Sequence, residues 1–481
     1  MSGGDEWRTT TWAAIARGLL AHVVMLRDVA ILDDQSAASL LTAIDSVHRG
    51  EPPAITGSLA LVAAFDERFD SLTPAGSSGA GRIARARHDL AATAQRLVLR
   101  DQALTLASAL DVARGALIDL AEGHVFTLMP AWSGSALLQP TNLAHFLTGT
   151  TAPLGRSAQR LHNAYDVLDR SAMGAGALAG PGFPVDRDEI ADLLGMEGPI
   201  QSTFDALCAV DYLIAVAEAA SSIVGPIRRL LIEFTLWLRT DPHAIRLADE
   251  LLAPVDLNLP HFRPPATLER VIADARAVEE TASTIAHTVS ETPYGPVGEM
   301  GDRAVALAGS ALHLAASVAE LCTTLVSGPI EINRAWLARN AGRDLITLGD
   351  LGDFLMAEEG LDPASARDIA ALTAHRARQE GLEASGITPP LIDAAALLVI
   401  GRELGIEIER LGAYLAPRRF VEKRTMLGGP APAAVRELLQ GERTRLEADQ
   451  RWLEGKRQRI ALAEANLEIR MQEILSAANT G

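Results

Sequence analysis

The sequence is poor in aromatic residues, and no long stretch of it is free of charge. Aromatic residues make up 4% of the 481 residues, so the 48% hydrophobic content comes mostly from Ala, Leu, Val and Ile. Ala and Leu favour helix. Because no run of about 18 uncharged apolar residues occurs, we expect no membrane-spanning helix. The N-terminus also lacks the basic and apolar regions of a signal peptide, so we expect a cytoplasmic protein.

Positive charge is also scarce. The chain has 43 Lys and Arg against 61 Asp and Glu, which gives a net charge of -18. A protein that binds nucleic acid needs a basic face to neutralise phosphates, and no basic run in this chain supplies one. We therefore exclude nucleic acid as a partner and expect a soluble protein that repels other copies at long range.

The residue patterns of disulfide, metal and phosphate sites are missing as well. The two cysteines, Cys208 and Cys322, lie in apolar helical patterns. We expect buried free thiols there, and neither a disulfide framework nor a zinc site. The sequence contains no phosphate-binding glycine loop, no nucleophile elbow and no metal-ligand spacing. It therefore predicts a protein that works without a cofactor or a bound metal.

Apolar residues at helical spacing fill nearly the whole chain, which predicts an all-α fold. Segment 205–237 is the clearest candidate for a core helix, because apolar residues such as Tyr212, Val216 and Ile223 fall on one face of it. A chain of this length is too long for one compact core, so we expect two or three domains. Breaks rich in Gly and Pro separate the helical stretches, and they fall at 73–81, 174–184, 253–265 and 291–301.

The C-terminal segment carries a heptad pattern of single apolar residues. The residues that recur at intervals of seven are Leu439, Leu446, Leu453, Ile460, Leu467 and Ile474. Companion positions such as Glu442 and Asp449 are charged, so the apolar stripe is one residue wide. Two interpretations remain open, a long surface helix that lies against the body of its own chain and a helix that packs on a neighbouring subunit.

Four stretches together resemble argininosuccinate lyase, and they occur in the order of that family. They are RARHD at 85–89, MPAWS at 129–133, GAGALAG at 174–180 and GGPAP at 428–432. The resemblance covers roughly residues 55 to 440. It implies an all-α, three-domain fumarase/aspartase-type fold with a central long-helix bundle. It also implies a homotetramer in which each active site is built from three different subunits.

The resemblance and the breaks together predict the domain boundaries. We place an N-terminal helical domain at 1–108, the central long-helix bundle at 109–344, a small C-terminal helical domain at 345–440 and an additional heptad helix at 441–481. The chemistry that the family implies is an elimination. A base removes a proton next to a carboxylate, and the C–N bond then breaks to release fumarate. Such a site needs a base and groups that hold the growing negative charge.

The sequence departs from the family at most of its catalytic positions. The family's base is a serine in a mobile loop, and the matching stretch here, 256–265, contains none. Asp256 falls near the serine position, and Phe262 or Arg263 falls near a lysine of that loop. Ser133 and Gly134 replace a threonine and a histidine of the second stretch.

The charge of the predicted pocket changes too. In the first stretch Ala86 and His88 replace a serine and an asparagine, while Arg87 and Asp89 remain. Tyr294 matches a family tyrosine, but Glu299 and Asp302 fall at or near a glutamine and a lysine that hold substrate carboxylates. Two unit charges about 4 Å apart interact by roughly 4 kcal/mol at an effective dielectric of about 20, so a succinate dianion should bind poorly.

These residues predict a divergent lyase that takes a small-molecule substrate other than argininosuccinate, of a kind found in specialised biosynthesis. It would perform elimination, or the reverse addition, at a C–N or similar bond without the usual serine. The candidate catalytic residues are Asp256, His261 and His88, and the candidate substrate-binding residues are Arg87, Ser133, Gln139, Arg263, Tyr294 and Glu299. The alternative is a non-catalytic scaffold that retains the fold. An enzyme should have a polar cleft, whereas a scaffold should have that cleft collapsed or filled with apolar side chains.

Overall fold

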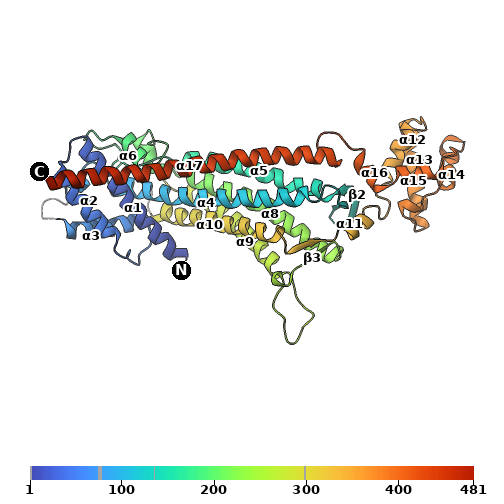
Figure 1. Ribbon diagram of the computed structural model, residues 1–481, viewed down its shortest axis with the longest axis horizontal. Helices are drawn as coiled ribbons and strands as arrows, with labels where there is room; N and C mark the ends of the chain where they lie inside the picture. Colours follow the sequence, from blue (N-terminus) through green and yellow to red (C-terminus); the bar gives the residue numbers. More distant parts are fainter. Residues whose placement is uncertain (1–2, 74–78, 135, 297–298, 481) are drawn as a thin grey trace.

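The computed structural model describes residues 3–73, 79–134, 136–296 and 299–480. The molecule is elongated, and its long helices run side by side along the long axis (Figure 1). The N-terminal helices form one end, and a small helical unit with residues from about 345 to 415 forms the other (Figure 1). An all-α fold with a central bundle of long helices is confirmed.

The central bundle is made of five long helices. They are α4 (Arg87–Glu122), α5 (Leu143–Leu168), α8 (Asp211–Thr240), α9 (Ala266–Ser290) and α10 (Glu299–Val326). Helix α8 contains most of the segment predicted as a core helix, and its Tyr212, Val216 and Ile223 are buried, as their spacing on one face requires. The broadest helix contacts join α4 to α10, α8 to α9 and α5 to α8.

The N-terminal helices build a second core around large apolar side chains. Helices α1 (Gly3–Asp28), α2 (Asp34–His48) and α3 (Ser58–Leu72) pack there with α6 (Arg187–Leu193). Trp12 and Phe65 are fully buried in this core, with ring centroids 4.7 Å apart. The predicted boundary at residue 108 lies inside α4, because this one helix contributes apolar residues to both cores.

The small C-terminal unit has its own core, built around Phe354, Ile369 and Ile392. Its helices are α12 (Gly349–Ala357), α13 (Pro363–Gln379), α14 (Pro389–Ile400) and α15 (Ile408–Tyr414). The short connecting helices of the chain are α7 (Thr203–Cys208), α11 (Arg334–Asn340) and α16 (Pro417–Glu422). Asp350 is fully buried and forms ion pairs of 2.7 Å with both Lys423 and Arg424. A lone buried carboxylate would be costly, so these two cations fix α16 onto the unit.

Two short antiparallel hairpins interrupt the helical pattern. Strands β1 (Leu128–Ser133) and β2 (Ala136–Asn142) pair with an irregularity between Ala131 and Trp132, and β3 (Ile245–Leu247) pairs with β4 (Ile330–Ile332). The sequence did not predict these strands, because Pro130 and Pro140 lie opposite each other in the first pair and β3 and β4 are three residues long. Strands β3 and β4 are too short to show alternation, and the prolines obscure it in β1 and β2.

The C-terminal helix α17 (Pro432–Thr480) runs from the small unit back along the whole bundle to the N-terminal helices (Figure 1). Five members of its heptad stripe are buried and Ile460 is half-buried, because they pack on α4, α5, α1, α2 and α6 of the same chain. Of the two interpretations, the helix that lies against its own body is therefore correct for the apolar stripe. The helix begins at Pro432, so the predicted boundary at 440 also lies inside a helix.

Charged residues beside the stripe add specific contacts between α17 and the body. Arg114 of α4 is buried and its Nη1 lies 2.5 Å from Oδ2 of Asp449. Near the middle of α17, Arg459 pairs with Glu197 and donates to the carbonyl oxygen of Met196. Exposed ion pairs contribute little to stability, so the buried apolar stripe and the buried Arg114 pair account for most of the attachment.

Two helical segments are long and apolar enough to cross a membrane by length and composition, namely Glu6–Asp28 and Gly301–Val326. In the fold, 72% and 56% of their most apolar windows are buried against other helices, as in core helices of soluble proteins. Both cysteines are free, but only Cys322 is buried as predicted. Cys208 is half-buried at the end of α7, and the expectation for it was wrong in this respect.

The heptad stripe yields a stability prediction with a control on the same helix. Leu453 is buried in the main core, whereas Leu462 is 71% exposed. Leu453→Ala should lower the free energy of unfolding by about 2–4 kcal/mol, because it leaves a cavity. Leu462→Ala should change it by less than about 0.5 kcal/mol. Thermal unfolding of the two variants measures the difference, and equal Tm shifts would mean that the stripe does not pack on this body.

Candidate functional site

The first turn of α4 carries two of the predicted site residues, Arg87 and His88. Asp89, the next residue, is fully buried and accepts hydrogen bonds from two backbone N–H groups, that of Ala86 at 3.1 Å and that of Gly176 at 2.9 Å. The side chain therefore caps α4 and joins it to the Gly-rich stretch 174–180. Gly176 adopts a φ of +64°, in the left-handed region that favours glycine. Burial raises the pKa of Asp89 to about 7.

Ion pairs fix the segment before α4. Asp66 of α3 is buried and binds Arg85 at 2.7 Å and Nε of Arg87 at 3.0 Å. His22 of α1 contacts the carbonyl oxygen of Ile83 at 2.9 Å. The side chain of Arg87 remains 46% exposed, so its outer nitrogens are accessible from the surface while Asp66 sets its direction.

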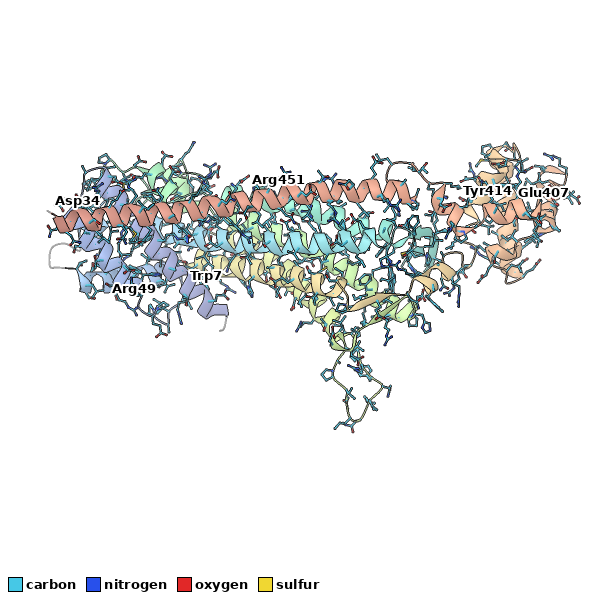
Figure 2. All side chains as sticks on the ribbon, viewed as in Figure 1. Trp7, Asp34, Arg49, Glu407, Tyr414 and Arg451 are labelled. Atoms are coloured by element: carbon cyan, nitrogen blue, oxygen red, sulfur yellow. The ribbon has the colours of Figure 1, made fainter. Side chains whose placement is uncertain are left out.

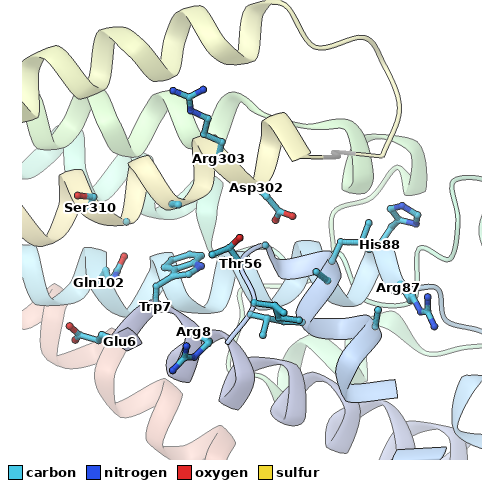
Figure 3. Close-up of a pocket in the computed structure, with 18 of the residues that line it drawn as sticks. Glu6, Trp7, Arg8, Thr56, Arg87, His88, Gln102, Asp302, Arg303 and Ser310 are labelled. Carbon is cyan, nitrogen blue, oxygen red and sulfur yellow. The ribbon is translucent and has the colours of Figure 1, made fainter. Parts of the chain in front are cut away.

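Arg87 and His88 line a cavity of about 1030 Å³ between α1, the start of α3, α4 and α10 (Figure 3). A cavity of this size suits a small-molecule ligand. Its polar lining comes from Glu6, Arg8, Thr56, Arg87, His88, Gln102, Asp302, Arg303, Ser310 and His313. Trp7, Ile55, Leu59 and Ala306 are among the apolar lining residues. The cavity is therefore open, and its lining mixes polar and charged groups with apolar side chains.

Asp302 of α10 has a structural role in this cavity. Its carboxylate accepts hydrogen bonds from the backbone N–H of Ser58 at 3.0 Å and from Nε2 of Gln95 at 2.9 Å. Helix α3 begins at Ser58, and its N-cap residue Gly57 has no side chain that could cap it. Asp302 supplies that cap from another helix, and a negative charge there is stabilised by the helix dipole.

Ser133 and Gln139 lie at the opposite end of the bundle from His88 (Figure 1). Both are exposed on the β1–β2 hairpin. Just after the hairpin, the ring of His145 contacts Oγ1 of Thr141 at 2.8 Å and the carbonyl oxygen of Gly428 at 3.1 Å. The segment that follows the second stretch therefore contacts the fourth stretch at Gly428, and these contacts give His145 a structural role.

Asp256 and His261 lie in a loop, residues 253–264, that extends away from the body (Figures 1 and 2). Both residues are exposed, and Asp256 accepts a hydrogen bond from the backbone N–H of Asn258 at 2.7 Å. Within one chain this loop does not reach the cavity that Arg87 and His88 line, and neither Asp256 nor His261 lines it.

Arg263 closes the base of the loop. Its guanidinium donates to the carbonyl oxygens of Ala253 at 3.1 Å and Asp249 at 3.0 Å, and it forms an ion pair of 3.2 Å with the Asp249 carboxylate. It lines a separate cavity of about 840 Å³ beside β3 and β4. These contacts hold the ends of the loop together, which gives Arg263 a structural role that the sequence did not indicate.

Tyr294 lies in the turn between α9 and α10 and is 92% exposed. Glu299 is the first residue of α10, and its side chain lies outside the described residues. One chain thus brings Arg87, His88 and Asp302 together. The predicted site residues that lie away from this cavity are Ser133, Gln139, Asp256, His261 and Arg263. Sequence reasoning missed Glu6, Trp7, Gln102 and His313, because nothing in their local pattern shows that α1 crosses the face of α4 and α10.

Among the described residues, no group of three or more His, Cys, Asp or Glu is arranged to hold a metal ion. The charged groups of the cavity are instead spread over three helices, which suits the recognition of a small polar molecule.

Comparisons with known proteins identify the family. A lyase family pattern matches residues 77–241. Argininosuccinate lyase 2 of Agrobacterium fabrum is 32% identical over 89% of this chain and 85% of its own length. Argininosuccinate lyase of Methanoculleus marisnigri is 31% identical over 90% of this chain and 87% of its own length. The chain belongs to the argininosuccinate lyase family.

Two solved lyase structures share the fold. The crystal structure of EDDS lyase in complex with formate has a TM-score of 0.88 at 24% identity, over all of this chain and 97% of that one. Fumarate lyase from Mesorhizobium sp. BNC1 has a TM-score of 0.72 at 17% identity, over 92% of this chain and 99% of that one. Membership of the family supports elimination chemistry, and it confirms the resemblance drawn from the four stretches.

The buried Asp89 of this lyase predicts a pH effect on stability. An aspartate in an unfolded chain has a pKa of about 3.9, and burial raises the folded value to about 7. The folded chain therefore binds more protons between these values, so this contribution to stability is present near pH 4 and is lost as the pH rises through 7. Asp89→Asn should flatten that part of the dependence. Tm values from about pH 5 to about pH 8 measure it.

The matched control for this experiment is Asp188→Asn, which changes an exposed carboxylate on α6. It should leave the pH dependence as it is in the wild type. If Asp89→Asn and Asp188→Asn give parallel curves, burial of Asp89 does not raise its pKa.

The cap formed by Asp302 predicts a difference between two substitutions. Asp302→Ala should lower the free energy of unfolding by about 1 kcal/mol, because the N–H of Ser58 loses its acceptor. Asp302→Asn keeps an acceptor oxygen and should lose less. Chemical denaturation of both variants measures the difference, and an Asn variant as unstable as the Ala variant would argue against a cap.

Proposed function

We propose that this protein is a lyase that eliminates an amine from a substrate less anionic than argininosuccinate, or adds the amine in the reverse direction. One observation carries the proposal, which is that the carboxylate of Asp302 lies in the cavity lined by Arg87 and His88. The dipole of α3 offsets about half a charge of that carboxylate, and the rest repels a second anion. A substrate with one carboxylate near Arg87 and a neutral or cationic remainder fits this charge pattern.

The two candidate bases of the projecting loop do not line this cavity within one chain. The loop 253–264 carries Asp256 and His261, and it also exposes apolar side chains such as Leu257, at 95%, and Phe262, at 58%. Exposed apolar side chains on a projecting loop favour contact with another protein surface. We propose that the loop of another copy completes the cavity, and that the exposed hairpin with Ser133 and Gln139 does so from a further copy, in a homotetramer.

In the completed site each group has a defined task. Asp256 or His261 takes the proton from the carbon next to the substrate carboxylate, and the electron pair that remains moves onto that carboxylate. Arg87 stabilises this developing negative charge, and His88 beside it contacts the leaving group. The electron pair then returns to form the C=C bond while the C–N bond breaks, and the nitrogen, protonated in the substrate, leaves as a neutral amine. Arg263 is the weaker candidate for charge stabilisation, because Asp249 already pairs with it. Tyr294, in the turn before α10, and Glu299, the first residue of α10, would contact the substrate from the same end as His88.

A scaffold without activity is the competing function. The open cavity with charged groups in its lining favours an enzyme, because a scaffold should have this cleft collapsed or filled. Absence of turnover with every lyase substrate tested would favour the scaffold.

The test is an ultraviolet absorbance assay for unsaturated acids, run on argininosuccinate, adenylosuccinate, aspartate and a panel of N-substituted aspartates. We expect turnover with one or more neutral or cationic N-substituents and less with argininosuccinate. Asp256→Asn or His261→Ala should lower kcat by at least about a hundredfold, because general-base catalysis contributes that much. The control is Asn258→Ala in the same loop. Equal rates for Asp256→Asn, His261→Ala and the control would exclude both bases.

Shared sites are tested by combining two defective variants. His88→Ala and Asp256→Asn would each be inactive as homomers. Mixed assemblies formed by co-expression should regain activity, because some sites then receive an intact residue from each chain. Absence of any recovery, with mixed assemblies present by mass, would argue that each chain completes its own site.

A further inference from the structure

The cavity extends far beyond Arg87 and His88. Along α10 its lining runs from Asp302 to His313, which are eleven residues apart in the same helix. An α-helix rises about 1.5 Å per residue, so this wall is about 16 Å long. Gln102 lines the distant part from α4 and His88 lines the near part. A reacting group held at His88 would leave most of this length for the rest of a ligand.

The middle of the cavity is apolar and has a specific shape. Trp7 of α1 lies between Gln102 and Thr56, and its ring packs on Gly309 of α10 (Figure 3). A Cβ atom at position 309 would lie 3.0 Å from Cζ3 of Trp7 and 2.9 Å from Oε1 of Gln102, so a larger residue would displace both side chains. Leu59, Ala60 and Ala306 continue this apolar wall.

The distant end of the cavity offers hydrogen-bond acceptors. It is lined by Glu6, Gln102, Ser310 and His313. The Oε1 atom of Gln102 is buried and accepts no hydrogen bond from the described residues. A buried acceptor without a donor is unfavourable, so a ligand donor that reaches Gln102 would be favoured. Arg8 also lines the cavity, whereas Arg303 extends away from Trp7 (Figure 3).

We propose that this part of the cavity binds the substituent on the leaving amine. We call it the amine groove, and it is formed by Trp7, Gln102, Gly309, Ser310 and His313. The inference rests on the proposed function, which places the carboxylate-bearing side of the scissile C–N bond at Arg87 and His88. The substituent is an alkyl or aromatic chain of about 10 Å or more, to match the apolar wall. It ends in a hydrogen-bond donor such as an amine or an amide.

Substitutions on one face of α10 test the groove. Ser310→Trp fills the distant end of the groove. Thr324→Trp is the matched control. Thr324 is also exposed and lies fourteen residues, or about four turns, further along the same face of α10. The substrates are N-alkyl aspartates with chains from ethyl to dodecyl, with and without a terminal amine. In the wild type kcat/KM should rise with chain length. Ser310→Trp should lower it at least about tenfold for long chains and leave the ethyl substrate unchanged.

Trp7→Ala provides a second variant in case Ser310→Trp fails to fold. It removes the apolar wall and should reduce the preference for long chains over short ones, a ratio that does not depend on the amount of folded enzyme. If neither variant changes that ratio, the groove does not bind the substituent. If Ser310→Trp dissociates the assembly in sedimentation while Thr324→Trp does not, the groove is a contact between copies and the inference is wrong.

Binding separates this inference from the proposed function. Calorimetry with the free amines, from ethylamine to diaminododecane, needs no turnover. One outcome is that the wild type binds long amines, Ser310→Trp does not, and the wild type turns over no substrate. This outcome would support the groove and refute the lyase. Turnover of short and long substrates at equal rates would support the lyase and refute the groove.

Discussion

The buried carboxylate of Asp89 is the interaction on which the arrangement of the site depends. It binds the backbone of two segments that are far apart in sequence, the start of α4 and the Gly-rich stretch around Gly176. Two N–H groups in a dry interior must find an acceptor, and the same side chain satisfies both. Because Arg87 and His88 precede it in the same helical turn, their positions follow from where Asp89 is held.

Helix α17 supports the same region from the outside. Arg459 binds the carbonyl oxygen of Met196 and the carboxylate of Glu197, which follow α6. The Gly-rich stretch precedes α6, and Met196 and Glu197 follow it. Helix α17 and Asp89 therefore hold the two sides of the same segment, which surrounds α6. A single helix that crosses both the bundle and the N-terminal core also prevents the two from moving independently, because its apolar stripe is buried in each.

The sequence predicted the features that arise from local periodicity and from ordered motifs. Helical spacing identified the bundle, and the heptad stripe identified α17, but periodicity alone could not tell which surface the stripe covers. The short strands were missed because three residues show no alternation. The motifs predicted that Arg87 and His88 belong to a site. They could not show that Arg263 closes its own loop or that Asp302 caps α3, because both roles depend on backbone groups brought close only by folding.

The two roles of Asp302 connect stability with specificity. A cation at this position could not cap α3, because an ammonium group has no acceptor to offer the N–H of Ser58. Gly57 leaves the helix without a cap of its own, and a Cβ atom there would lie 2.9 Å from Oδ2 of Asp302. The glycine and the aspartate therefore fit each other, and a change in one constrains the other. Having adopted this cap, the fold holds a negative charge in the cavity, and a substrate must accommodate it.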